Sequence, residues 1–157
     1  MKVLLINGSP HEKGCTYTAL SEIAGVLNEN GIDTEIFQVG SDPIRGCVGC
    51  GGCAGKNRWV FQDQVNVALD KAAEADGFIF GSPVHYASAG GAITSFLDRM
   101  FFAGKENMVY KPGAAVVSCR RAGSTATLDQ LNKYFTISSM PLVGSSYWNM
   151  VHGNTPE

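Results

Sequence analysis

The 157-residue sequence lacks the features that would place it in a membrane or on nucleic acid. No apolar run reaches the roughly 18 residues that a membrane span requires. No basic run is longer than the pair Arg120 and Arg121, and a net charge of −2 gives no positive field for nucleic acid or anionic lipid. Met1 leads directly into an apolar stretch, which leaves no room for a signal peptide. We therefore expect a cytoplasmic protein with no nucleic-acid partner and no membrane partner.

The common nucleotide-binding fingerprints are also missing. Gly8 and Gly14 are not followed by a third glycine in register, and no Gly-Lys-Ser or Gly-Lys-Thr follows them. A dinucleotide-binding Rossmann motif and a P-loop are therefore disfavoured. Cysteines number only five, and three of them crowd together at Cys47, Cys50 and Cys53. This spacing indicates metal or redox chemistry in a reducing compartment rather than a disulfide framework.

What the sequence does contain begins with a strand, a tight loop and a helix within residues 2–20, KVLLINGSPHEKGCTYTAL. The continuous apolar run at residues 3–6 is typical of a parallel strand that is covered on both faces. Thr16 or Thr18 is expected to cap the following helix. Because a helix N-terminus attracts anions, we predict that this loop binds phosphate, with hydroxyls from Ser9, Thr16 and Thr18. An ordinary strand-to-helix connection is the alternative.

Strand and helix patterns then alternate along the chain. We predict further strands at 32–39, 77–83, 114–118 and within 140–148, and helices at 63–75, capped by Asp63, and at 87–102 and 125–135. Five strands interleaved with helices predict a doubly wound α/β fold, with one domain over residues 1–157. The stretch at 40–55 breaks all periodicity and is expected to be a functional loop. Thr155, Pro156 and Glu157 resemble a helix start, so we expect a truncated C-terminal helix.

Three loops of this fold are expected to form one site. Ligands bind at the carboxyl ends of the strands in open α/β sheets, so the loops after the first, third and fourth strands should meet. These loops span residues 9–18, 82–86 and 119–123. They offer a phosphate cradle, a flat wall with an aromatic side chain, and a glycine-containing turn with two cations. A phosphorylated planar cofactor would fit that combination.

Two stretches of the sequence resemble one protein family. INGSPHEKGCT is similar to the flavin-phosphate loop, and GSPVHYASAGGAITSFLDRM to the flavin-ring loop and dimer-forming helix, of the NADPH-dependent FMN reductase family of flavodoxin-like proteins. The resemblance covers essentially the whole chain and implies a five-stranded sheet in the order 2-1-3-4-5. It also implies non-covalently bound FMN, NADH or NADPH as electron donor, a quinone, flavin or other small acceptor, and a homodimer or homotetramer.

The same resemblance predicts the residues that bind FMN. Those expected near the phosphate are Ser9, His11, Gly14, Cys15, Thr16 and Thr18, and those expected near the isoalloxazine ring are Pro83, Val84, His85, Tyr86, Ser88, Arg120 and Gly123. No catalytic residue of the chain is expected, because the flavin carries the chemistry and the protein positions it.

Cys47, Cys50 and Cys53 place the resemblance in the branch that includes the iron–sulfur flavoproteins. In that branch a fourth cysteine follows shortly, whereas here residues 54–62 contain none. A [4Fe–4S] cluster normally needs four thiolates and a structural zinc needs four ligands, so free thiols are favoured over metal. A ligand from Cys119, His85 or another subunit, and a disulfide between neighbouring cysteines, remain alternatives. Two other functions stay open: an iron–sulfur flavoprotein electron carrier, and a non-enzymatic flavin-binding redox or metal sensor.

The helix expected at 87–102 has an apolar stripe that indicates contact with a second subunit. We expect Asp98 and Arg99 to form an ion pair on this helix or at the subunit interface. Trp59 is expected in the core or in a dimer contact, with covering of a neighbouring subunit's flavin as the alternative.

Overall fold

Strand β1 (Lys2–Asn7) lies inside the molecule and contacts apolar layers on both of its faces. A computed structural model describes residues 1–156. In it, Leu4 and Ile6 belong to the larger apolar cluster, whereas Val3 and Leu5 belong to a second cluster on the opposite face. This two-sided burial explains why the apolar run of the first strand is continuous instead of alternating.

The parallel strands are ordered β2-β1-β3-β5-β6. Their bounds are Asp33–Gln38 for β2, Gly77–His85 for β3, Gly113–Cys119 for β5 and Met150–His152 for β6. Counted along the chain, this is the predicted order 2-1-3-4-5, so the predicted fold class is confirmed. The additional strand β4 (Ser88–Ala89) pairs antiparallel with the end of β3.

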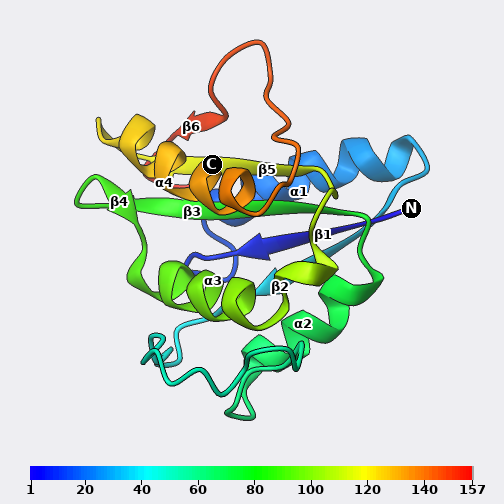
Figure 1. The fold of residues 1–157 in the computed structure, drawn as a ribbon. Helices are drawn as coiled ribbons and strands as arrows, with labels where there is room; N and C mark the ends of the chain where they lie inside the picture. Colours follow the sequence, from blue (N-terminus) through cyan, green and yellow to red (C-terminus); the bar gives the residue numbers. More distant parts are fainter. Residues whose placement is uncertain (157) are drawn as a thin grey trace.

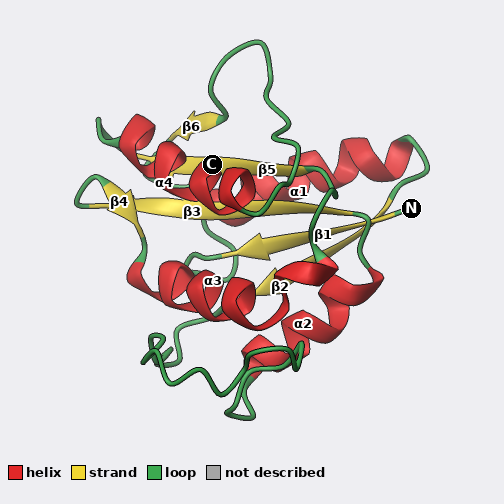
Figure 2. Cartoon of the chain, in the orientation of Figure 1, coloured by secondary structure: helices red, strands yellow, loops and turns green. Residues whose placement is uncertain are grey.

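Helices cover both faces of the sheet (Figures 1 and 2). Helix α1 (Cys15–Glu29) packs on one face, and α2 (Gln64–Glu74), α3 (Gly91–Gly104) and α4 (Ser124–Ile137) supply the larger cluster on the other. A short 3₁₀ helix, η1 (Lys105–Asn107), follows α3. Asp63 caps α2 as predicted, because its carboxylate accepts a hydrogen bond from the Val65 N–H at 3.0 Å. Over the described residues, the structure contains no helix that is both long and apolar enough to cross a membrane.

Two predictions about element positions are wrong, and a third falls partly outside the described residues. The helix expected at 87–102 begins only at Gly91, because residues 85–89 form a hairpin with β3. Neither Thr16 nor Thr18 caps α1: its N-cap is Gly14, and no side chain within residues 1–156 caps that end. Glu157, the last residue of the predicted helix-start signature, lies outside the described residues.

The last strand also differs from its prediction within 140–148. Gly113 forms an isolated bridge with Leu142, yet Val117 pairs with Met150, so the edge strand contains extra residues that loop out of the sheet. Tyr147 and Trp148 are exposed on this loop, which projects from the top of the molecule in Figure 1. Regular pairing is therefore resumed only at β6.

Candidate functional site

The three predicted loops do lie together at the carboxyl edge of the sheet. The Gly8 N–H donates to the Gly81 carbonyl at 2.9 Å, which joins the end of β1 to β3. A Cβ atom on Gly8 would lie 2.5 Å from Ile93 Cβ, and one on Gly123 would lie 2.9 Å from Ala87 Cα. Only glycine permits these close approaches, so the loops after β1, β3 and β5 contact one another directly or through α3.

The loop between β1 and α1 is held by two polar side chains, Asn7 and Gln38. Asn7 is fully buried, and its amide nitrogen donates to Gln38 Oε1 and to the Glu12 carbonyl, while its oxygen accepts from the Ser9 N–H at 3.1 Å. Gln38 Nε2 in turn donates to the Ser9 carbonyl at 2.7 Å. The loop therefore has a defined shape before any ligand binds.

The N-terminus of α1 has the character of an anion site. Its N-cap Gly14 has no side-chain hydrogen bond to the helix from within the described chain, so the first-turn N–H groups have no side-chain cap. Together with the positive end of a 15-residue helix dipole, these groups fit a phosphate. His11 is exposed beside this end and adds an imidazole.

The three predicted hydroxyls have protein partners of their own. Ser9 is buried and its oxygen accepts from the His11 N–H at 3.1 Å. Thr16 is also buried, and its hydroxyl lies 2.7 Å from that of Ser118, which joins α1 to β5. Thr18 donates to the Gly14 carbonyl at 3.3 Å. These side chains shape the loop, which leaves the backbone N–H groups at the start of α1 as the candidate anion donors.

The predicted ring wall is the β3–β4 hairpin. Pro83 and Val84 are half-buried, whereas His85 and Tyr86 are exposed. The turn residues Tyr86 and Ala87 have φ angles of 50° and 59°, a left-handed conformation that residues other than glycine and asparagine rarely adopt. Such strain persists only where the surroundings enforce it, and it gathers at functional sites.

Helix α4 supplies the restraint on this hairpin. Gln130 Oε1 accepts hydrogen bonds from the Ser88 hydroxyl at 2.8 Å and from the Ala89 N–H at 2.9 Å. Gly123, the N-cap of α4 with a φ of 99°, lies against Ala87. Arg120 is exposed just before it and brings a cation to the same edge of the sheet.

Sequence reasoning missed the side chains that hold these loops: Asn7, Gln38, Ser118 and Gln130. Asn7 gave a usable signal, because an amide that directly ends a buried apolar run must find partners inside the protein. Gln130 gave none, since a glutamine within a helix is most often exposed.

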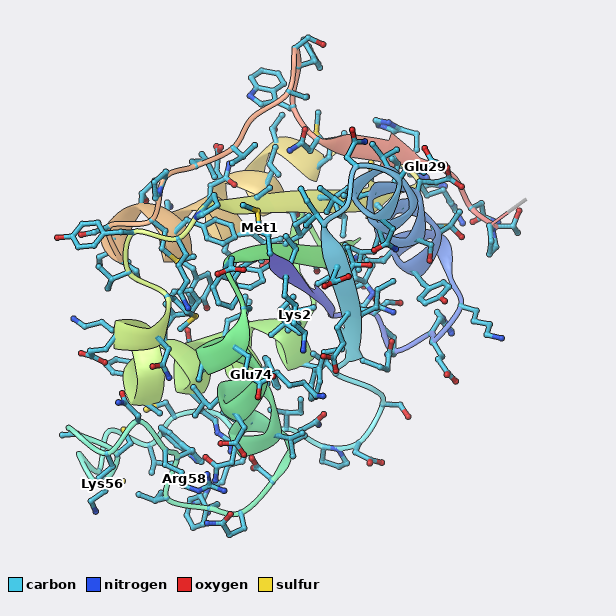
Figure 3. The ribbon with its side chains drawn as sticks, turned by 90° about the vertical axis from the view of Figure 1, so that its right-hand side faces the viewer. Met1, Lys2, Glu29, Lys56, Arg58 and Glu74 are labelled. Atoms are coloured by element: carbon cyan, nitrogen blue, oxygen red, sulfur yellow. The ribbon has the colours of Figure 1, made fainter. Side chains whose placement is uncertain are left out.

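The loop between β2 and α2, residues 40–62, carries the three clustered cysteines and is called the cysteine loop below. Cys47 is half-buried, Cys50 is exposed and Cys53 is buried, and all three are free thiols. Lys56 and Arg58 lie at its outer side, away from the sheet (Figure 3). Within residues 1–156, no three His, Cys, Asp or Glu side chains converge in a geometry suited to a metal ion. With one thiolate too few and no converging set, the residues present do not fit a four-thiolate cluster.

The predicted pairing of Asp98 with Arg99 is wrong. Arg99 is 1% exposed and forms its ion pair with Asp63, while its Nη1 donates to the Arg45 carbonyl at 3.1 Å. Asp98 instead accepts from the Tyr134 hydroxyl at 2.5 Å. Burial, and after it this carboxylate, raises the pKa of Tyr134 above its ordinary value. Trp59 lies in the core, which was the first of its two predicted roles.

Comparison with known proteins identifies the family to which the sequence is similar. The model of the NADPH-dependent FMN reductase family matches residues 1–155. An iron–sulfur flavoprotein of Methanocaldococcus jannaschii is 32% identical over 99% of this chain and 82% of its own length. An FMN-dependent NADPH-azoreductase of Staphylococcus saprophyticus is 34% identical over 64% of this chain and 52% of its own.

A solved structure extends the comparison to the fold. The NAD(P)H:quinone oxidoreductase from Methanothermobacter marburgensis superposes with a TM-score of 0.74, over 99% of this chain and 85% of that protein. The two sequences are 13% identical, so this similarity concerns the fold alone.

Proposed function

The chain belongs to the NADPH-dependent FMN reductase family, and from this premise we propose that it binds FMN and oxidises NADH or NADPH. The electrons pass to a quinone, a flavin or another small acceptor by a ping-pong route. The observation that carries the proposal is the meeting of three loops around an α1 N-terminus whose first N–H groups have no side-chain cap within residues 1–156. This arrangement offers a phosphate site next to an exposed wall.

In this proposal the chain's own residues bind and orient the cofactor. The N–H groups at the start of α1, near Ser9, His11 and Cys15, hold the phosphate. The hairpin residues Pro83 to Tyr86 support the isoalloxazine, with Ser88, Arg120 and Gly123 at its edge. Bound FMN supplies the hydride chemistry, and the protein supplies position and electrostatics.

The proposal includes assembly into a homodimer, or a homotetramer built from it. Helix α3 is apolar on its inner side and also exposes Phe102, which is 70% accessible in the isolated chain. Ile137 of α4 is 86% accessible, and both residues line one cavity of about 350 Å³ between the two helices. Exposed apolar side chains on adjacent helices support a subunit contact here.

A direct test is titration of the flavin-free protein with FMN, followed by turnover measurements without oxygen. We expect quenching of the flavin fluorescence to saturate at one FMN per chain, and oxidation of NADH or NADPH to depend on added quinone or flavin. Protein that stays colourless after addition of FMN would contradict the proposal. Bound FMN without turnover, for any donor and acceptor pair, would instead indicate a flavin-binding sensor.

A second candidate is an electron carrier of the iron–sulfur flavoprotein type. It is favoured by the 32% identity to a protein of that name over 99% of this chain. Such a carrier requires an iron–sulfur cluster, and the cysteine loop contains three closely spaced cysteines where four are needed. We therefore place it second to the reductase.

A further inference from the structure

The cysteine loop is anchored in the main core by Trp59, a side chain that belongs to neither the flavin site nor the thiol set. We infer that Trp59, held beneath the Arg99 guanidinium, anchors the stretch in which the fourth cysteine is missing, so that the loop folds without a four-thiolate cluster. The inference extends the proposed function, because it leaves bound FMN as the electron-transfer centre, but its evidence does not depend on FMN binding.

The position of Trp59 is the first observation. The fourth cysteine of the iron–sulfur branch would fall shortly after Cys53, and of residues 54–62 only Trp59 is buried, at 3% exposure. The residues on either side of it, Arg58 and Val60, are exposed. The chain therefore turns inward once in this stretch, and it does so at an indole.

The second observation is that the backbone of Trp59 is fixed on both sides by Asn66, a residue of α2 that is 2% exposed. The Trp59 N–H donates to Asn66 Oδ1 at 2.7 Å, and Asn66 Nδ2 donates to the Trp59 carbonyl at 3.2 Å and to the Phe61 carbonyl at 2.9 Å. A buried amide that makes three backbone bonds defines the path of the chain without help from a metal.

The third observation is the cation above the ring. The Arg99 guanidinium carbon lies 4.9 Å from the centre of the Trp59 ring, within the range of a cation–π contact. The same guanidinium bonds to the Asp63 carboxylate and to the Arg45 carbonyl. Arg99 thus links the start of the cysteine loop, the indole and the cap of α2.

Cys53 is buried and bonds to another part of the protein. It is 8% exposed, and its thiol donates to the Phe102 carbonyl at 3.8 Å. Cys50 is exposed on the other side of Gly51 and Gly52. In the wild type the three thiols are therefore in different environments, whereas the ligands of one cluster must converge on a common centre. Replacing the indole is expected to release the loop, so that the thiols can converge.

Iron reconstitution gives a test that does not involve flavin. The full-length protein, its Trp59→Cys variant and an Arg58→Cys control are incubated anaerobically with ferrous iron, sulfide and a thiol, then desalted and analysed for iron and acid-labile sulfide. We expect the wild type and Arg58→Cys to remain without stoichiometric iron, and Trp59→Cys to gain about four iron atoms per chain. Arg58→Cys has the same number of cysteines, with the new one at an exposed position whose native side chain bonds to Asp70 of α2.

Hydrogen exchange of the iron-free wild type keeps the inference testable if Trp59→Cys does not fold. We expect the amides around Trp59 to be protected, and Arg99→Lys, which keeps the charge but loses the planar fork, to speed exchange there and not in β1. Four irons per wild-type chain, an unprotected loop in iron-free protein, or a folded Trp59→Cys without iron would each overturn the inference. Failure of FMN to bind would leave it intact.

Discussion

Single buried side chains set the shape of the site, and Asn7 is the clearest case. It is fully buried, and its amide group contacts Gln38, Glu12 and Ser9. Removing it would leave buried polar partners without their bonds, and an unsatisfied buried group destabilises a protein by about 1–3 kcal/mol. The geometry of the phosphate loop and the stability of the fold therefore depend on the same residue.

We predict that Asn7→Ala lowers the free energy of unfolding by about 2 kcal/mol and also weakens FMN binding. Urea unfolding of the flavin-free protein measures the first effect, and fluorescence titration with FMN measures the second. Asn30→Ala is the control, because Asn30 is exposed at the end of α1, where its side chain donates to the Val26 carbonyl. The idea fails if the two variants are equally stable.

Glu35 allows a prediction on pH. Lys71, and after it Lys2, hold the pKa of Glu35 below its ordinary value of 4.5. Lys2 and Glu74 lie near each other (Figure 3). Lys2 begins β1, so this pair is at the amino ends of the strands, and the site is at their carboxyl ends. A lowered folded-state pKa means that the stabilisation is present above pH 4.5 and is lost as the pH falls through the folded-state value.

The expected result is that wild type exceeds Glu35→Gln in stability by about 0.5 kcal/mol near neutral pH, and that this difference vanishes in acid. The size is small because the three charged groups are partly exposed and screened. Chemical denaturation at several pH values measures the difference. Glu29→Gln, at the exposed end of α1, is expected to show no such trend, and a gap that widened in acid would reverse the argument.

At the scale of elements, the β3–β4 hairpin stores strain. Tyr86 and Ala87 both have positive φ, and turns of this kind strongly prefer asparagine and glycine. Gln130 and Gly123 hold the hairpin from the side of α4. The conformation is therefore imposed by tertiary contacts rather than chosen by the turn residues.

We predict that Ala87→Gly raises the free energy of unfolding by about 0.5–1 kcal/mol, because glycine relieves the left-handed strain. The higher conformational entropy that glycine gives the unfolded chain offsets only part of this gain. Thermal and urea unfolding measure the change. If the variant were less stable than wild type, the turn would not be strained.

Gly123→Ala should act in the opposite direction, with a loss of about 2–3 kcal/mol, since its Cβ would meet the Ala87 backbone at 2.9 Å and its φ is 99°. Gly25→Ala provides the matched control. A Cβ on Gly25 meets nothing within 4 Å, and alanine is the better helix former, so a gain of about 1 kcal/mol is expected. Equal effects at the two glycines would exclude close packing as the cause.

The β3–β4 hairpin is an element that the sequence does not predict. Residues 85–89 contain no Asn-Gly or Asp-Gly signal, so the sequence predicts a loop to residue 86 and a helix from residue 87 instead of a hairpin. The pairing of Asp98 with Arg99 failed for a geometric reason, because adjacent residues on a helix do not face each other. Arg99 instead reaches Asp63, which is distant in sequence and brought near by the packing of α2 on α3.

For the whole molecule, the alternation of buried strands and helices predicted the doubly wound fold and the meeting of the three loops. The order of the strands was implied by the resemblance to the family. The edge strand did not follow. Leu142, Val143, Tyr147 and Trp148 have the composition of a strand, yet all four are at least 43% exposed. At an edge, pairing with one neighbour decides the strand, and composition does not encode that register.

The proposed dimer is the last prediction at this scale. Phe102 and Ile137 flank the cavity between α3 and α4, and a carboxylate placed among them would be desolvated by a second subunit. We expect wild type to elute as a dimer in size-exclusion chromatography with light scattering, and Phe102→Glu to elute as a monomer with an unchanged circular dichroism spectrum. Val26→Glu is the control, since Val26 is 60% exposed on α1, on the other face of the sheet, and should leave the dimer intact. A monomeric wild type would refute the dimer, and dissociation by Val26→Glu alone would move the interface to α1.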